Sequence, residues 1–179
     1  MIEDTQRRLR PVAVLNQLPP AEFAAAVRPL FEAAGPLETA LHAARPYSSY
    51  ADLVERAESI AAQMPLEQQI QVVNAHPRIG ENATVVRSQS ALSYREQGYD
   101  SDVGLSAAEA QRVYDTLADL NRAYEDRFGF RFVIFVNKRP KSQIIEFLRM
   151  RLTNSRATEL QTALRELFAI ARDRCQQLT

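Results

Sequence analysis

The sequence predicts an all-α fold, a compact single-domain bundle of about eight helices with one short extended segment. Apolar residues recur at three- and four-residue steps through most of the chain, which places them on one face of a helix. Prolines and glycines separate these stretches at positions that suit helix starts and stops. Only residues 130–136 look like an extended segment, so we expect no sheet.

Length and composition set the broad class. The 179 residues suit one domain over 1–179 that can bury a core, with residues 1–10 as a candidate flexible N-terminal extension. Hydrophobic residues at 46% and charged residues at 25% are ordinary for a globular protein, and no apolar run approaches the ~20 residues that cross a bilayer. Lysine plus arginine equals aspartate plus glutamate at 22 each, so no net field favours nucleic acid. We expect a cytoplasmic protein that binds neither membrane nor nucleic acid.

Four helices are predicted in the first half of the chain, each bounded by proline or glycine. After a short apolar turn at 11–18, they cover residues 20–34, 37–44, 50–63 and 65–75. The apolar positions expected to face inward include Phe23, Val27, Leu30, Phe31, Ala34, Leu37, Leu41, Leu53, Ala57, Ile60, Leu66 and Ile70. His42 falls on the second of these helices, and we expect it to have a structural or surface role.

The second half begins with a capping box, in which Ser106 and Glu109 satisfy each other's backbone amides. It opens a long helix that Gly129 closes, and the apolar run 130–136 follows as a buried extended segment. Pro140 begins the next helix. Asn154 or Ser155 caps the last, whose stripe is Leu160, Leu164, Leu167, Phe168 and Ala171.

Between these halves, residues 74–100 interrupt the helical pattern around one of only two histidines. Pro77 ends the helix that leads to His76, so the imidazole projects from a helix end. An unperturbed histidine titrates near ~6.5 and suits proton transfer near neutrality. A lone histidine is also often structural, and the residues alone leave both interpretations open.

The sequence Ser93-Tyr-Arg-Glu96 in this stretch also has two interpretations. Ser93 and Glu96 match a second capping box, which the spacing favours. The same spacing puts both side chains on one helical turn, where they can face a ligand shared with His76. A serine can fill both roles.

Other kinds of site lack their motifs. No G-x-S-x-G nucleophile elbow or glycine-rich phosphate loop occurs. The two histidines lack the spacing of a zinc site, and the single Cys175 cannot form an internal disulfide or a cysteine-rich metal site. We expect no metal and no cofactor. The chemistry on offer is acid/base catalysis by a histidine and a glutamate.

Motifs along nearly the whole chain resemble the decarboxylases of 2-oxo-4-hydroxy-4-carboxy-5-ureidoimidazoline (OHCU). The matching motifs are Leu15-Asn16, Phe31-Glu32, Arg45-Pro46-Tyr47, Ala75-His76-Pro77-Arg78-Ile79-Gly80, Ser93-x-x-Glu96-Gln97, Leu120-Asn121-x-x-Tyr124, Phe128-Gly129-Phe130-x-Phe132-Val133, Arg151-Leu152 and Ile170-x-x-x-Arg174. Each is weak alone, but their order and spacing are specific. The resemblance implies an all-helical carboxy-lyase of urate and purine degradation that forms (S)-allantoin without metal or organic cofactor.

The resemblance also implies roles for individual residues. His76 would be the catalytic acid/base, and Glu96 would orient the substrate or His76. The implied substrate-binding residues are Pro77, Ser93, Gln97, Phe132, Ile134, Arg174 and, as second choice, Arg172. The substrate is the expected small-molecule partner, and a homodimer is a candidate assembly. The alternative is a non-catalytic helical module that binds a ureide or purine-like ligand.

The chain departs from the family pattern in two places. It has no tryptophan after the early Phe-Glu motif, and residues 98–105 replace the usual run after Glu-Gln. These departures affect the loop after Glu96 rather than the pair formed by His76 and Glu96.

Overall fold

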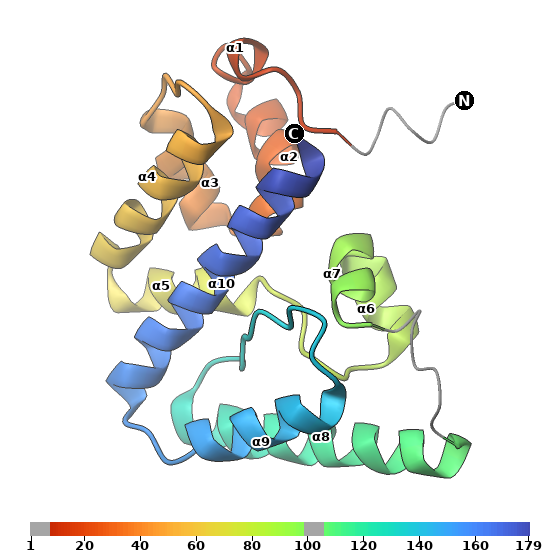
Figure 1. Ribbon diagram of the computed structural model, residues 1–179. Coiled ribbons are helices and arrows are strands. Elements are labelled where there is room, and N and C mark those ends of the chain that lie inside the picture. The colour runs from red at the N-terminus through yellow and green to blue at the C-terminus, as the bar shows by residue number, and fades with distance from the viewer. Residues whose placement is uncertain (1–7, 99–105) are drawn as a thin grey trace. The chain divides into compact units, whose positions relative to one another are not determined.

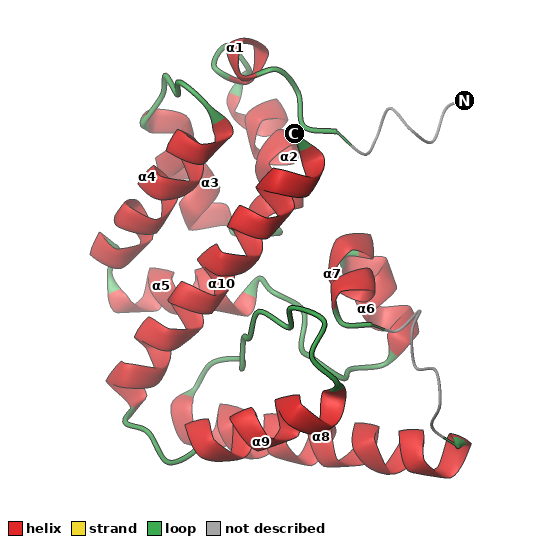
Figure 2. Ribbon diagram, viewed as in Figure 1, coloured by secondary structure: helices red, strands yellow, loops and turns green. Residues whose placement is uncertain are grey.

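The computed structural model describes residues 8–98 and 106–179, and the regular structure in this part of the chain is entirely helical. It contains ten helices, eight of them with seven or more residues. Figure 2 shows these helices joined by loops, with no strand among the described residues. This confirms the predicted all-α fold class. No helix in the described ranges is both long enough and apolar enough to span a membrane.

The chain forms two compact units, residues 1–75 with 164–179 and residues 76–163. The helices of the first are α1 (Val12–Leu15), α2 (Pro20–Phe31), α3 (Gly35–Ala43), α4 (Tyr50–Gln63) and α5 (Leu66–Asn74). Those of the second are α6 (Ala83–Gln89), α7 (Ala91–Glu96), α8 (Ala107–Phe128) and α9 (Lys141–Arg151). The last helix, α10 (Arg156–Leu178), begins in the second unit and continues in the first. The single domain predicted from length stays a prediction.

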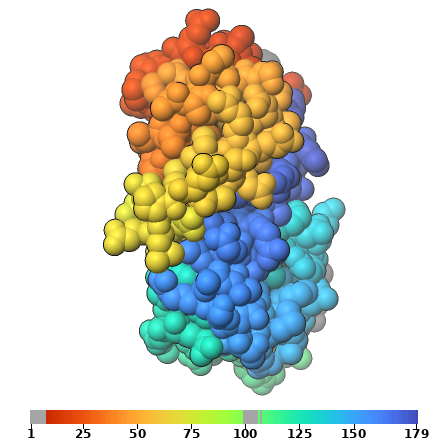
Figure 3. Space-filling view, turned by 90° about the vertical axis from the view of Figure 1, so that its left-hand side faces the viewer, coloured from red at the N-terminus to blue at the C-terminus, as the bar shows by residue number. Residues whose placement is uncertain are grey.

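In the first unit, α3 packs against α2, α4 and α5. The amber and yellow atoms of α4 and α5 lie next to each other in the space-filling view (Figure 3). Phe23, Leu41 and Leu53 are each 0% exposed, which confirms their predicted inward positions. Leu66 was expected to face inward but is 51% exposed, because it is the first residue of α5 and its neighbours there are polar. The imidazole ring of His42 lies edge-on against the ring of Phe23, with 5.4 Å between the ring centroids, in agreement with a structural role.

The ends of these helices follow local chemistry. The Ser49 hydroxyl accepts a hydrogen bond from the backbone N–H of Asp52 at 3.0 Å and caps α4, whose bounds match the prediction. Helix α2 was expected to reach Ala34 but ends at Phe31. Glu32 follows with φ of 57°, in the left-handed region that stops a helix, and α3 begins at Gly35.

In the second unit, α6 packs on α7 and α8 packs on α9, as Figure 1 shows. The capping box is confirmed, because Glu109 accepts from the Ser106 N–H at 2.9 Å and donates its own N–H to the Ser106 hydroxyl at 3.3 Å. Gly129 ends α8 with φ of 79°, as predicted. At the start of α10, Ser155 accepts from the N–H of Thr158, which makes Ser155 the cap of the two residues proposed.

Residues 130–136 contain neither helix nor strand, and five of them are buried: Phe130, Phe132, Val133, Ile134 and Val136. Three rings meet the ring of Tyr124 edge-on, those of Phe128, Phe130 and Phe132, with centroids 4.6, 6.0 and 5.3 Å away. Such edge contacts are favourable for aromatic pairs. The predicted buried segment is therefore anchored to α8 by its aromatic side chains.

Candidate active site

His76 begins a short turn, residues 76–80, which is named here the histidine loop. Helix α5 ends at Asn74, and His76 is 7% exposed. Its backbone carbonyl accepts a hydrogen bond from the Arg131 guanidinium at 3.1 Å. Because proline follows, the histidine cannot continue the helix, and this bond holds the peptide where the chain turns.

The rest of the histidine loop is also held by side chains of the second unit. Arg78 donates through Nε and Nη2 to the two carboxylate oxygens of Glu125, at 2.5 and 2.8 Å. The Asn121 amide donates to the carbonyl of Ile79 at 2.8 Å. Both partners lie on α8, four residues apart and so on one face. With the Gly80 N–H, which donates to Gln97, four of the loop's five residues hydrogen-bond to residues outside the loop.

Gly80 has to be glycine. Its φ is +72°, and a Cβ built on it would lie 2.6 Å from Cδ1 of Leu117 on α8. An L-residue would meet both the backbone penalty of the left-handed region and this overlap. The loop can therefore approach α8 closely only because position 80 has no side chain.

The electrostatics of this region come from two arginines. The hydrogen bond to Glu125 is the largest cause that raises the pKa of Arg78. Burial, followed by the positive charge of Arg78, lowers the pKa of Arg131. Arg131 is half-buried, and a charged donor there makes a stronger bond to the His76 carbonyl than a neutral donor would.

Gln97 links α7 to the histidine loop. Its side-chain oxygen accepts a hydrogen bond from the backbone N–H of Gly80 at 3.2 Å. Since an N–H requires an acceptor, this contact fixes the orientation of the amide. The Nε2 group is then the part of Gln97 that can donate to a ligand. Gln97 is 5% exposed, so a ligand that it binds is largely shielded from water.

Helix α7 also carries Ser93 and Glu96. The side chain of Ser90 caps α7 by accepting from the Ser93 N–H at 3.1 Å. The capping box predicted at Ser93 and Glu96 is therefore wrong, because the helix begins three residues earlier than that reading required. Ser93 is 0% exposed and Glu96 is half-buried. The whole of α6, capped by the Asn82 side chain, was also missed within residues 74–100.

Phe132 and Ile134 lie in the buried segment, 1% and 7% exposed. The carbonyl of Val133 between them accepts from Arg151 at 2.8 Å. Among the described residues, no hydrogen bond engages the backbone of Phe132 or Ile134. Buried backbone groups usually have partners, so this stretch of backbone is available to a ligand.

The two predicted arginines lie in the first unit and differ in environment. Arg174 is 1% exposed and donates to Glu32 at 2.8 Å and to the carbonyl of Pro29 at 3.2 Å. Arg172 is exposed and pairs with Glu58. Which of the two arginines binds a substrate stays a prediction.

The histidine loop also lines a pocket of about 300 Å³ in the second unit. Its lining residues are Arg78, Gly80, Glu81, Ala118, Asn121, Arg122 and Glu125. The Asn121 side-chain oxygen is buried and has no hydrogen-bond partner in the described part of the chain. This pocket was not foreseen from the sequence.

The family model for OHCU decarboxylase matches residues 16–176, which include parts of both units. The chain belongs to the OHCU decarboxylase family. It is therefore a member of a family of carboxy-lyases, as the resemblance implied.

Relatives of this OHCU decarboxylase family member support the assignment. This chain is 35% identical over 160 residues to the uric acid degradation bifunctional protein PucL of Bacillus subtilis. The match covers 89% of this chain but only 31% of that protein. It is 28% identical over 165 residues to the OHCU decarboxylase of Halalkalicoccus jeotgali, covering 92% of this chain and 89% of the relative. The chain thus spans less than a third of the bifunctional relative and most of the other.

A solved structure shares the fold of this family member. It is described as OHCU decarboxylase in the presence of (S)-allantoin, with a TM-score of 0.63 and 22% identity. The likeness covers 81% of this chain and 91% of that chain. It supports the all-helical architecture.

The structure brings some of the predicted site residues together and adds others. Gln97 contacts the histidine loop directly, and Ser93 shares α7 with Glu96. Sequence reasoning missed Asn121, Glu125 and Arg131, which hold the loop. Asn121 was noted only as part of a motif, and the spacing of Asn121 and Glu125 on one helix face was the available signal.

Proposed function

We propose that this chain decarboxylates OHCU to (S)-allantoin in urate degradation, with His76 as acid/base and Glu96 as the orienting carboxylate. The observation that carries the proposal is the family match over residues 16–176, which includes the histidine loop and α7. The geometry of that loop supports it, because a buried histidine held through its backbone suits a defined proton transfer.

The chemistry needs no cofactor to be reasonable. Loss of carbon dioxide from the carboxylate leaves an electron pair that the adjacent ring C=N and carbonyl groups can take up. The hydroxyl on the same carbon then gives up its proton and becomes the new carbonyl, while the neighbouring ring carbon that carries the ureido group gains a proton. The protein has to orient the carboxylate, stabilise the developing charge and deliver that proton to one face.

His76 is proposed to move this proton. A histidine can both accept the hydroxyl proton and return a proton to carbon near neutral pH. Glu96 is proposed to hold His76 or the substrate, since a carboxylate accepts hydrogen bonds from an imidazole N–H or a ureido N–H. Pro77 next to His76 contributes a buried wall without a competing N–H donor.

The remaining residues are proposed to bind the substrate's polar edge. Gln97 donates through Nε2, because its oxygen is occupied by Gly80. Ser93 bonds a ring or ureido atom, and the backbone of Phe132 and Ile134 supplies further donors and acceptors. Arg174, or as second choice Arg172, grips a carboxylate or carbonyl oxygen with its planar fork. No metal or organic cofactor is part of the proposed reaction.

The test is the decay of OHCU with and without the purified, chelator-treated protein, followed by the optical rotation of the allantoin formed. The proposal requires faster decay and an excess of the (S) enantiomer. Equal decay rates together with measurable binding of (S)-allantoin would instead favour a non-catalytic binding module for ureides or purine-like ligands. Glu96→Gln should keep binding but lower turnover.

A further inference from the structure

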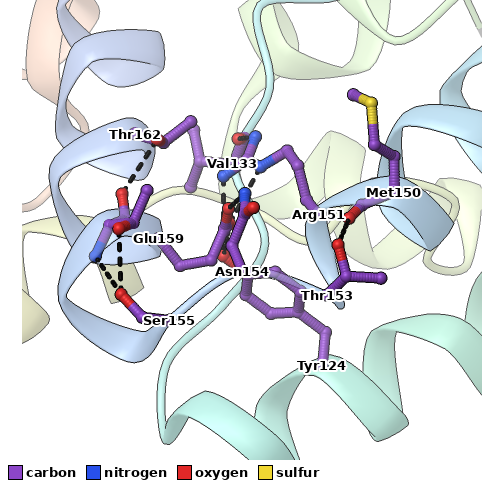
Figure 4. Close-up of polar contacts among 10 residues, drawn as sticks. Tyr124, Val133, Met150, Arg151, Thr153, Asn154, Ser155, Glu159 and Thr162 are labelled. Carbon is purple, nitrogen blue, oxygen red and sulfur yellow. Dashed lines mark hydrogen bonds and ion pairs between the residues drawn. The ribbon is translucent and has the colours of Figure 1, made fainter.

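A buried ion pair in the second unit is not used by the residues proposed above. Glu159 is 0% exposed and Arg151 5%. Arg151 Nε donates to Glu159 Oε2 at 2.9 Å, and the Tyr124 hydroxyl donates to the same oxygen at 2.5 Å. The Asn154 amide donates to the other oxygen at 2.7 Å. Figure 4 shows Tyr124 of α8, Arg151 of α9 and Asn154, from the connection between α9 and α10, around Glu159 of α10.

Stability alone does not account for this arrangement. Removing two charges from water costs about as much as their attraction returns, so buried ion pairs contribute little net stability. The neighbouring buried segment, residues 130–136, is already held by apolar contacts, since the ring centroids of Phe132 and Tyr124 are 5.3 Å apart. Arg151 also covers that ring, with 4.5 Å between the guanidinium carbon and the ring centroid, and an apolar side chain could do the same.

Apolar packing cannot set the rotation of a peptide group, because it is non-directional. A guanidinium can, because its donors have a fixed geometry. Arg151 Nη1 donates to the carbonyl oxygen of Val133 at 2.8 Å, which fixes the plane of the peptide between Val133 and Ile134. In a trans peptide the N–H points opposite to the C=O. The Ile134 N–H therefore points away from Arg151.

The Ile134 N–H is the group in this segment that can donate a hydrogen bond to a ligand. Ile134 is 7% exposed, and within the described ranges no hydrogen bond engages its backbone. Buried N–H groups without a partner are rare in proteins, and such a group usually meets water or a ligand. A donor fixed in advance on a buried segment is what an oxygen that gains charge during a reaction requires.

We infer that Arg151 is a positioning residue: by holding the Val133 carbonyl, it presents the Ile134 N–H as a donor to an oxygen atom of the substrate. The inference rests on the proposed function and deepens it. Glu159 holds Arg151, and Tyr124 and Asn154 in turn hydrogen-bond to Glu159. Burial, and next the hydrogen bond to Glu159, raise the pKa of Tyr124, so its hydroxyl stays a donor across the neutral range.

The test combines kinetics with NMR of the full-length protein. The first variant is Arg151→Met with Glu159→Gln, which removes both charges so that neither is left buried alone. The second is Arg151→Lys, whose single nitrogen cannot hold Glu159 and Val133 together. We expect a roughly ten- to a hundredfold loss of kcat/KM for OHCU in both, because a misplaced donor weakens transition-state binding. The ¹⁵N–¹H signal of Ile134 should shift on addition of (S)-allantoin in the wild type and shift much less in the variants.

Arg156→Met is the matched control. Arg156 donates to the carbonyl of Phe128 at 2.7 Å, and its guanidinium carbon lies 5.8 Å from the centroid of the Phe130 ring. Like Arg151, it therefore holds a backbone carbonyl and covers an aromatic ring in the second unit. It does not touch the Val133 peptide and should keep kcat/KM within about threefold of wild type. Unchanged kcat/KM and an unchanged Ile134 shift in Arg151→Lys would overturn the inference. A wild type that shifts at Ile134 without turning over OHCU would instead overturn the proposed function alone.

Discussion

The side-chain oxygen of Gln97 accepts a hydrogen bond from the backbone N–H of Gly80 at 3.2 Å. This contact joins α7 to the loop that begins with His76, and it determines which end of the Gln97 amide is left for a substrate.

Gln97→Glu keeps an acceptor for the Gly80 N–H but replaces the Nε2 donor with a second carboxylate oxygen. We expect little change in thermal stability and a rise in KM of about tenfold or more, because a negative oxygen replaces a donor facing an anionic substrate. Steady-state kinetics with OHCU and a melting curve measure the two effects. Gln97→Met, which loses donor and acceptor, should be less stable than Gln97→Glu. A Gln97→Glu protein with wild-type KM would show that Nε2 does not bind the substrate.

Gly80→Ala should destabilise the fold by about 2–4 kcal/mol, since it adds left-handed strain and an overlap with Leu117. Chemical denaturation gives the free energy of unfolding. Gly35→Ala is the control, because no atom lies within 4 Å of its added Cβ and its change should stay within about 1 kcal/mol. Equal effects of the two substitutions would contradict the close approach of the loop to α8.

Substitutions of the two C-terminal arginines should differ clearly in their effect on kcat/KM. Arg174→Met is expected to lower kcat/KM by about a hundredfold or more, whereas Arg172→Met should stay within about twofold because Arg172 is exposed. Glu32→Gln provides the control for structural damage, as it removes the charge partner of Arg174 and leaves the guanidinium in place. If Glu32→Gln lost as much activity as Arg174→Met, the arginine would be structural rather than substrate-binding.

Stability should fall in alkaline solution through two buried tyrosines of the first unit. Burial is the main cause that raises the pKa of Tyr47 and of Tyr50 to about 12. The unfolded chain releases these protons near pH 10 while the folded chain retains them, so stability is intact below pH 10 and declines from there towards pH 12. The loss should be about 1–3 kcal/mol per tyrosine. Tyr50→Phe, followed by urea unfolding at pH 8 and pH 11, should show a smaller decline than the wild type; an equal decline would exclude Tyr50 as a source.

The sequence predicted well whatever depends on neighbours along the chain. The capping box at Ser106, the glycine stop at Gly129 and the bounds of the helix at 50–63 were correct because caps and stops are local chemistry. Ser90 and Ser93 show the limit of that approach. Both serines precede a helical turn at suitable spacing, and the choice of Ser90 follows from α6 ending just before it.

Contacts between residues far apart in the sequence could not be predicted from helical periodicity. Glu32 and Arg174 are 142 positions apart, and Arg78 and Glu125 are 47 apart. Nothing in a helical stripe indicates that an arginine will pair across the fold rather than face water. The motifs that contain Arg174, Asn121 and Arg151 were visible as resemblance, but these side chains donate to the backbone carbonyls of Pro29, Ile79 and Val133, and any residue supplies a backbone carbonyl.

His76 is the residue on which the proposed reaction depends most, and the chain offers a direct comparison because it has two histidines. The decisive measurement is the initial rate of OHCU decarboxylation by His76→Gln and His42→Gln, at a temperature where circular dichroism shows both folded. We predict that His76→Gln loses at least about a hundredfold in kcat, as expected for loss of a general acid/base, while His42→Gln keeps most of the wild-type rate. A folded His76→Gln protein that forms (S)-allantoin at the wild-type rate would contradict the account.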